Sequence, residues 1–347
     1  MVVGPRHNDQ MPRPRPHWPL AIGLAAGVAL DALLGDPRRG HPVAAFGRAA
    51  AALEARDYAD SRPRGAVHAA ACILAAAAPA ALVARGTRAR PPWHAAAAAI
   101  AVWAVTGARS LHCEAERIMA ALADDDLIAA RRALPSLCGR DPDGLGAAEM
   151  TRAVIESVAE NTCDAIVAPL LWGAVAGLPG LAVYRAVNTL DAMVGYRSPR
   201  YLRFGWASAR LDDAANWVPA RVTAALAVAC ALAVPLPGTS AQSPPAEGHL
   251  VRGPARSAWQ TVRRDGASHP SPNAGRCEAA FAGALGVRLG GTNTYGGVAE
   301  ARPGLGDGRD PEPDDIRRAV RLSRAVTVAT AGLAAALALT CGGRRSR

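Results

Sequence analysis

The sequence contains no lysine and only three phenylalanines among its 347 residues. All 39 basic residues are therefore arginines, which excludes enzymes that form a lysine Schiff base with pyridoxal phosphate and excludes a P-loop lysine. Half of the residues are hydrophobic, but so few large aromatic side chains would build a poor core for a soluble protein of this length. We therefore expect lipid to cover much of the apolar surface.

Cysteine pairs of the zinc-binding type are also missing. The seven cysteines include no C-x-x-C pair, so we expect neither a zinc site nor a disulfide framework. The formal net charge is +10, yet the arginines are spread over all the loops rather than gathered into a basic helix or patch. This distribution argues against a nucleic-acid partner and favours membrane surfaces and anionic small molecules.

The apolar residues are concentrated in six blocks that are separated by arginines. The blocks are residues 18–35, 66–84, 93–108, 165–184, 220–236 and 325–341. Several approach the roughly 20 apolar residues that cross a bilayer. We predict an all-α, polytopic integral membrane protein of the cell membrane, with four to six membrane helices and a site carried by polar helical loops. Buried helices of an alanine-rich soluble protein are the alternative.

Two segments do not fit a packed membrane unit. Residues 1–17 are rich in proline and arginine, and we expect a disordered basic extension there. Residues 238–254 are rich in proline, serine and glycine, a composition typical of a flexible linker. Residues 18–347 are then expected to form a single membrane-embedded catalytic unit that contains this linker.

The densest polar stretch covers residues 149–216. Its first helix places Glu149, Arg152, Glu156 and Glu160 along one face, at positions i, i+3, i+7 and i+11. Carboxylates one turn apart repel each other unless a cation lies between them, as when Mg²⁺ bridges nucleotide phosphates. We therefore predict that Glu156 is a catalytic base or a metal ligand and that Glu160 is a metal ligand, with a solvated helix face as the alternative.

A second polar cluster follows the fourth apolar block. Arginine forks fit phosphate groups, and paired aspartates can hold a metal ion. Arginines that only mark the membrane edge are the alternative. The predicted metal ligands here are Asp212 and Asp213, and the predicted substrate or phosphate ligands in this stretch are Arg197, Arg210, Asn161, Asn188 and Asn216.

Three shorter segments supply further candidates. His41 lies in a turn rich in glycine and proline and is a second candidate for the catalytic base, although a solvated loop explains it equally well. Ser271 and Asn273 can begin a helix whose first N–H groups are open to an anion. Asn293 and Tyr295 stand between glycine pairs that permit close approach of the backbone to a ligand. Glycine alone is weak evidence for such a site.

Several long runs of residues are similar to one known family. They are GDPRRGHPV, RAVIESVAENTCDAIVAPLLW, YRAVNTLDAMVGYRSPRYLRFGWASARLDDAANWVPARVTA and HPSPNAGRCEAAFAGALGVRLGGTNTYGG. Together they resemble the CobD/CbiB family of cobalamin biosynthesis proteins, the adenosylcobinamide-phosphate synthases. The runs span nearly the whole chain apart from residues 1–17 and the segment 238–254.

The resemblance implies an acid–amine ligase of the late corrin pathway. It would join adenosylcobyric acid to (R)-1-amino-2-propanol, or its O-phosphate, through an amide bond, with ATP and Mg²⁺ as the expected cofactors. The expected partners are these small molecules and the lipid bilayer, with other late corrin-pathway membrane enzymes as further candidates. The missing lysine argues against the pyridoxal-dependent decarboxylase that also carries the name CobD. A non-catalytic membrane sensor like the AmpE proteins is the alternative.

The order of the apolar blocks limits the membrane topology. If all six blocks crossed the membrane, the motifs would lie on opposite sides and could not share a site. Residues 165–184, which are interrupted by prolines and glycines, are therefore expected to fold back. For all the motifs to meet, residues 220–236 must also fail to cross.

Overall fold

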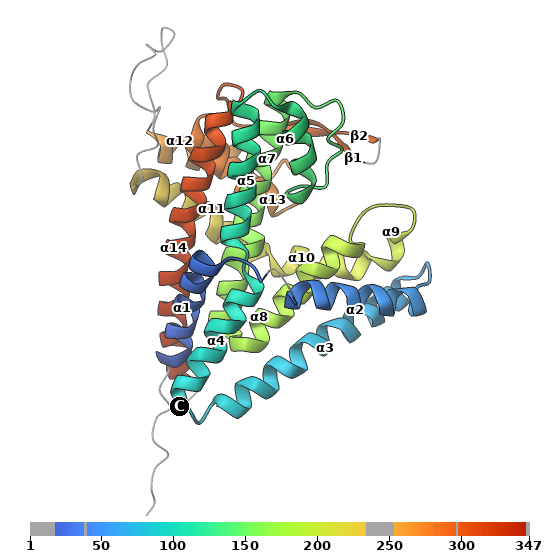
Figure 1. Ribbon diagram of the computed structural model, residues 1–347, viewed down its shortest axis with the longest axis vertical. Helices are drawn as coiled ribbons and strands as arrows, with labels where there is room; N and C mark the ends of the chain where they lie inside the picture. Colours follow the sequence, from blue (N-terminus) through green and yellow to red (C-terminus); the bar gives the residue numbers. More distant parts are fainter. Residues whose placement is uncertain (1–17, 38–39, 234–252, 296–297, 345–347) are drawn as a thin grey trace, which may run out of the picture.

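The computed structural model describes residues 18–37, 40–233, 253–295 and 298–344, without the side chains of residues 293–299 and 341–344 (Figure 1). The extension expected at residues 1–17 lies outside the described residues. So does most of the expected linker, although its last residue, Pro254, begins a helix.

Helices dominate the described chain. The first group, in chain order, is α1 (Trp18–Leu34), α2 (Pro42–Asp57), α3 (Arg62–Thr87), α4 (Pro91–Val105), α5 (Ala108–Ala123), α6 (Leu127–Ala133), the 3₁₀ helix η1 (Leu134–Ser136), α7 (Ala147–Thr162) and the π-helix η2 (Cys163–Val167). The second group is α8 (Ala168–Val194), α9 (Tyr201–Phe204), α10 (Trp206–Ala215), α11 (Trp217–Ala233), α12 (Pro254–Asp265), α13 (Ala274–Leu285) and α14 (Pro313–Arg344).

One small antiparallel hairpin interrupts this helical fold. Strand β1 (Leu289–Tyr295) pairs with β2 (Val298–Leu305), with Thr292 opposite Ala301 and an irregularity between Leu289 and Gly291. The sequence analysis considered only the glycine pairs of this segment and predicted no strand in it. Threonine and tyrosine between the glycines favour a strand, and this signal was missed.

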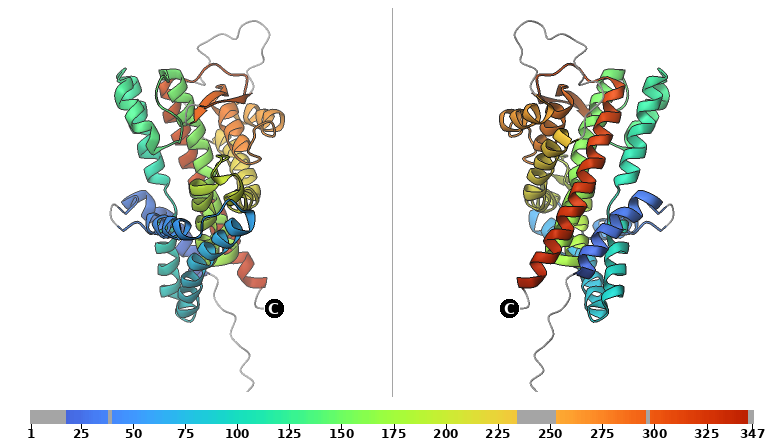
Figure 2. Two further views of the ribbon diagram at one scale, coloured as in Figure 1. Left: turned by 90° about the vertical axis from the view of Figure 1, so that its right-hand side faces the viewer. Right: turned by 90° about the vertical axis from the view of Figure 1, so that its left-hand side faces the viewer.

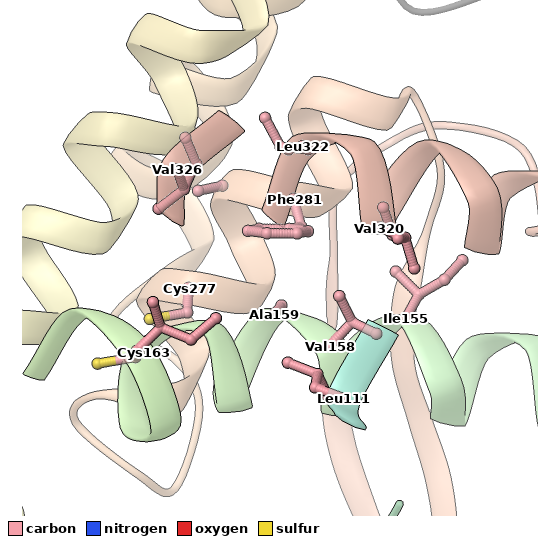
Figure 3. Packing of buried hydrophobic residues seen from close by; sticks show 14 of the residues in the cluster. Leu111, Ile155, Val158, Ala159, Cys163, Cys277, Phe281, Val320, Leu322 and Val326 are labelled. Carbon is pink, nitrogen blue, oxygen red and sulfur yellow. The ribbon is translucent and has the colours of Figure 1, made fainter. Parts of the chain in front are cut away.

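The core is built around α7. Ile155 and Val158 are completely buried, and they lie beside Leu111 of α5, Phe281 of α13 and Val320 of α14 (Figure 3). Packing against three helices fixes the rotation of α7 about its own axis. The stripe of carboxylates on α7 is thereby held in a fixed direction, away from the apolar core.

Helix α8 reverses its direction at Gly177, whose φ of 70° and ψ of −154° are not helical. The Tyr184 hydroxyl donates a hydrogen bond to the Asp164 carbonyl oxygen at 3.2 Å. In a straight helix these residues would lie about 30 Å apart, because each residue adds about 1.5 Å. The expected folding back of residues 165–184 is therefore confirmed.

Three helical segments are long and apolar enough to cross a membrane: Arg62–Thr87, Ala147–Val194 and Pro313–Thr340. The second contains the reversal in α8. The bent pair α10 and α11 makes a fourth candidate, with 42° between its halves. Helices α1 and α4, which cover the first and third apolar blocks, are shorter, at 17 and 15 residues.

Helix α14 extends along the length of the molecule, with α5 on one side and α12 and α13 on the other (Figure 2). Apolar side chains on the long helices are exposed, including Leu82 of α3 and Val328 of α14. A bilayer would cover such faces. The predicted all-α polytopic fold is confirmed, with a number of candidate spans at the lower end of the expected range.

Candidate functional site

The site begins on the polar face of α7. Glu156 and Glu160 lie one turn apart there, and η2 extends the same face to Asp164. In this π-helix the Ala168 N–H donates to the Cys163 carbonyl oxygen, five residues back. Such wide turns inside α-helices occur frequently at functional sites.

Glu156 joins three parts of the chain. Its side chain is buried, and its Oε1 accepts a hydrogen bond of 2.6 Å from the Gly290 N–H on β1. Its Oε2 forms an ion pair with Arg140, and Arg152 Nε lies 3.9 Å from Oε1. A side chain at Gly290 would collide with the Pro303 carbonyl oxygen, so this approach of the backbone to Glu156 requires glycine.

Glu160 has a different environment. Its side chain is exposed, and within the described part of the chain it has no hydrogen-bond partner. It lies close enough to Arg302 and Asp212 for their charges to interact. Asp212 itself is oriented by two amides, because its oxygens accept from Asn188 at 3.4 Å and from Asn216 at 3.0 Å.

The same two asparagines connect the helices around the site. Asn188 on α8 also donates to Asp164 at 3.4 Å, so that it bridges two carboxylates. Asn216 is buried and accepts a hydrogen bond of 2.8 Å from the Tyr184 hydroxyl. Both predicted ligands are therefore at the site, where they position carboxylates.

The start of α13 forms the next wall. Asn273 donates from its amide to the Asp213 carbonyl oxygen at 2.8 Å. The Ser271 hydroxyl accepts from the N–H groups of Asn273 and Ala274, at 3.3 and 3.2 Å. The predicted helix start is confirmed, but Ser271 already uses the N–H of Ala274, the first of the helical N–H groups that were expected to be open to an anion.

Glu278 and His269 complete this wall, with 3.9 Å between His269 Nε2 and Glu278 Oε1. Burial, followed by the charges of Glu156 and Glu160, raises the pKa of Glu278 well above its usual range. Burial, followed by the charge of Arg302, lowers the pKa of His269. Burial therefore disfavours the charged form of each of these two groups.

We call Glu156, Glu160, Asp164, Asp212 and Glu278 the carboxylate cluster. Across the described residues, no group of three or more His, Cys, Asp or Glu side chains is arranged as a ready-made metal site. Mg²⁺ commonly uses only one or two carboxylates and completes its shell with phosphate and water. Glu160, which lacks a hydrogen bond among the described residues, and the oriented Asp212 fit that requirement.

Some predicted site residues lie apart from this cluster. His41 Nδ1 accepts from the Val43 N–H at 3.2 Å at the start of α2, and its Nε2 lies 4.0 Å from Asp36 Oδ1. Arg197 and Arg210 are exposed and form no ion pair within the described part of the chain. The roles predicted for these three residues stay predictions.

The ligand roles predicted for Asn161, Asn293 and Tyr295 also stay predictions. Asn161 donates back to the Ser157 carbonyl oxygen on its own helix, at 2.9 Å. The backbones of Asn293 and Tyr295 lie in β1, but their side chains are outside the described residues.

The structure adds residues that the sequence analysis did not select. Asp164 could have been found, because it continues the four-residue spacing of Glu156 and Glu160. Arg302 could not, because nothing in the sequence around β2 indicates that it lies 2.7 Å from His269. Arg140 lies in the turn-forming segment 139–144, whose sequence is equally typical of an exposed loop.

The amino-acid sequence can be compared with those of known proteins. The sequence model of the CobD/Cbib protein family matches residues 24–323. The chain belongs to the CobD/CbiB family. This CobD/CbiB match includes every residue of the carboxylate cluster. No solved structure matches the chain.

Relatives in this family carry the name "Cobalamin biosynthesis protein CobD". The protein from Mycobacterium tuberculosis (strain H37Rv) is 54% identical over 319 residues, which are 91% of this chain and 95% of the relative. The Geobacter metallireducens protein is 44% identical, over 84% and 87% of the two chains. The Chromobacterium violaceum protein is 40% identical, over 93% and 98%.

Proposed function

We propose that this protein is an enzyme of cobalamin biosynthesis that forms an amide bond between adenosylcobyric acid and (R)-1-amino-2-propanol or its O-phosphate. Membership of the CobD/CbiB family supports the pathway. One structural observation supports the chemistry: Glu160, without a hydrogen bond among the described residues, lies within interaction range of the oriented Asp212. Four separate helices bring the surrounding polar groups to this place.

Amide formation requires activation of the carboxylic acid, for which we propose ATP. Mg²⁺ bound at the site would offset the negative charge of the phosphates. Glu160 and Asp212 would hold it, with Asp213 as a further candidate ligand. Arg140 and Arg302 lie close enough to Glu160 to limit repulsion between the carboxylate cluster and an anionic substrate.

A base must also keep the attacking amine unprotonated. Both oxygens of Glu156 accept hydrogen bonds, so as a base Glu156 would have to release the Arg140 contact when substrate binds. His41 Nε2 is the other candidate, at the beginning of α2. Glu156→Gln and His41→Gln are made separately, and the rate of amide formation is measured against pH for each. The variant that lacks the base should lose the rise in rate with pH that the unmodified enzyme shows.

Complementation tests the function as a whole. The recipient is a cobalamin auxotroph that lacks this step and therefore grows on cobinamide but not on cobyric acid. We expect growth on cobyric acid when this chain is supplied. A chain that inserts in the membrane but gives no growth would contradict the proposal and favour a non-catalytic role.

We further propose that the protein is a multi-pass protein of the cell membrane, with other late corrin-pathway membrane enzymes as candidate partners. The long apolar helices α3 and α14 support the membrane assignment. Cys113 on α5 is exposed, whereas Cys72, Cys163, Cys230 and Cys277 are buried. Labelling of Cys113 by a membrane-impermeant thiol reagent, in intact cells and in inverted vesicles, will report the side on which α5 lies. Equal labelling in both would contradict a fixed orientation.

A further inference from the structure

A cavity outside the carboxylate cluster lies between α11, α12 and α13. The cavity there has a volume of about 130 Å³. Its lining includes the apolar side chains of Ala224, Val228 and Val262, together with Arg221, Arg276 and Trp259. None of the described residues that line it is acidic, so the cavity has an apolar wall with two arginines among its lining residues.

Among the residues that the structure describes, neither guanidinium group has an anionic partner. Arg221 and Arg276 lie close enough for their charges to repel each other. Within the described residues neither forms an ion pair, and the Nε of Arg276 is buried without a hydrogen bond. Arg221 stacks on the Trp217 ring at 3.8 Å and donates to the Trp217 carbonyl oxygen at 2.6 Å, which holds it in place. Positive charges held in this way favour a bound anion, and arginine forks match phosphate.

This cavity is distinct from the carboxylate cluster. Arg276 and Glu278 are two positions apart on α13, which corresponds to about 200° around a helix. The two side chains therefore leave α13 on nearly opposite sides. Glu278 faces the other carboxylates, whereas Arg276 faces the groove beside α11 and α12.

The surroundings indicate which kind of phosphate would bind. Trp217 and Trp259 are exposed, and tryptophan is enriched where a protein meets the surface of a bilayer. Helix α12 is amphipathic and ends with Arg263 and Arg264, as helices that lie on membranes commonly do. The cavity can hold a phosphate group and the beginning of an apolar chain, while the rest of such a ligand would lie outside.

We propose that Arg221 and Arg276 bind the phosphate of an anionic phospholipid, with Trp259 and the apolar wall in contact with its glycerol and upper acyl groups. The site would attach the α11, α12 and α13 side of the protein to the membrane surface. This proposal does not depend on amide chemistry in the carboxylate cluster.

The test uses the full chain purified in detergent. Its thermal unfolding midpoint, Tm, is measured in mixed micelles with phosphatidylglycerol or phosphatidylcholine and, separately, with inorganic phosphate. We expect phosphatidylglycerol to raise the Tm by about 3 °C more than either of the others, because only a ligand bound to the folded state stabilises it. A full shift with inorganic phosphate would overturn the lipid assignment, and so would an equal shift with phosphatidylcholine.

Matched variants locate the effect. In R221Q and in R276Q, most of the difference between the Tm shifts caused by phosphatidylglycerol and by phosphatidylcholine should disappear. R256Q removes the same charge from an exposed position on α12 that does not line the cavity, and it should keep the difference. An unchanged lipid preference in R221Q and R276Q would overturn the proposal.

Native mass spectrometry of the unmodified chain covers the case in which a variant fails to fold. We expect one phosphatidylglycerol molecule to be retained in preference to phosphatidylcholine. No such preference would overturn the proposal.

Discussion

Asp315 at the start of α14 and Glu160 on α7 are both carboxylates with arginines nearby, but their surroundings differ. Asp315 is buried and accepts hydrogen bonds from Arg309 at 2.7 and 3.1 Å, from Arg318 at 2.5 Å and from the Glu312 N–H at 2.9 Å. Glu160 accepts none from the described residues. Its neighbours include the negative charges of Asp212 and Glu156 as well as arginines.

We interpret Asp315 as a structural charge and propose Glu160 as a functional one. Asp315 is satisfied on all sides and stabilises the beginning of a helix, where negative charge is favourable. The carboxylate cluster brings like charges together at an electrostatic cost, and sites that bear such a cost commonly bind a ligand. If this interpretation is right, substitutions in the two regions should affect different quantities.

The largest effect on stability is expected at Asp315. D315N leaves Arg318 buried without its charged partner, and we expect a loss of about 3 to 5 kcal/mol in the free energy of unfolding. D314N is the matched control, because Asp314 is exposed and, within the described residues, its ion pair is with Arg317 at the surface; it should cost less than about 0.5 kcal/mol. Thermal unfolding in detergent measures both. Equal losses would remove the distinction between satisfied and exposed carboxylates.

The opposite pattern is expected in the carboxylate cluster. E160Q and D212N should lower the rate of the proposed amide formation about 10²- to 10³-fold, which corresponds to about 3 to 4 kcal/mol in the barrier, with little change in Tm. Stabilisation of the wild-type protein by Mg²⁺ should also weaken in both variants, a readout that does not require activity. E149Q, which alters the capping contact with Gly146 at the start of α7, is the control. A large fall in Tm without loss of activity would place Glu160 among the structural carboxylates.

A buried neutral group extends the comparison. His112 Nε2 lies 2.9 Å from the Ser323 hydroxyl, and burial, followed by the charge of Arg324, lowers the pKa of His112 from 6.5 to about 4. Between these pH values the unfolded chain binds more protons than the native protein. The corresponding stability is therefore complete above pH 6.5 and is lost as the pH falls towards 4, by up to about 3 kcal/mol.

H112Q should flatten this part of the pH dependence of the free energy of unfolding. Chemical unfolding at pH 4 to 7 measures it. A slope that persists in H112Q would assign the effect to other titrating groups.

The smallest effect is expected at the reversal in α8. Gly177 has a positive φ, and its combination of φ and ψ is one that residues with a Cβ atom rarely adopt. We therefore expect G177A to lower the free energy of unfolding by about 1 to 3 kcal/mol. G86A in α3 is the control, because a methyl group there meets open space and the glycine has no positive φ. It should be neutral or slightly stabilising. A neutral G177A would show that the turn does not depend on glycine, and would weaken the link between this turn and the placement of Asn188.

Much of the fold could be predicted because helices and apolar blocks leave periodic patterns. Helical spacing predicts that Glu156 and Glu160 share one face of α7. The prolines and glycines that interrupt residues 165–184 predict the reversal at Gly177. The hairpin of β1 and β2 was missed because glycines, which disfavour strands, separate the few strand-favouring threonine and tyrosine residues. The carboxylates themselves were largely identified, but their different environments were not.

The sequence alone determined the helical framework, the apolar faces and the stripe of acids on α7, since each depends on neighbours within a few residues. Only the tertiary structure decided which carboxylates are satisfied. Glu156 receives its hydrogen bond from Gly290, which is 134 residues away, whereas Glu160, four residues from Glu156, receives none from the described chain. Hydrogen bonds and charges act through space, and contacts between distant segments leave no periodic trace in the sequence.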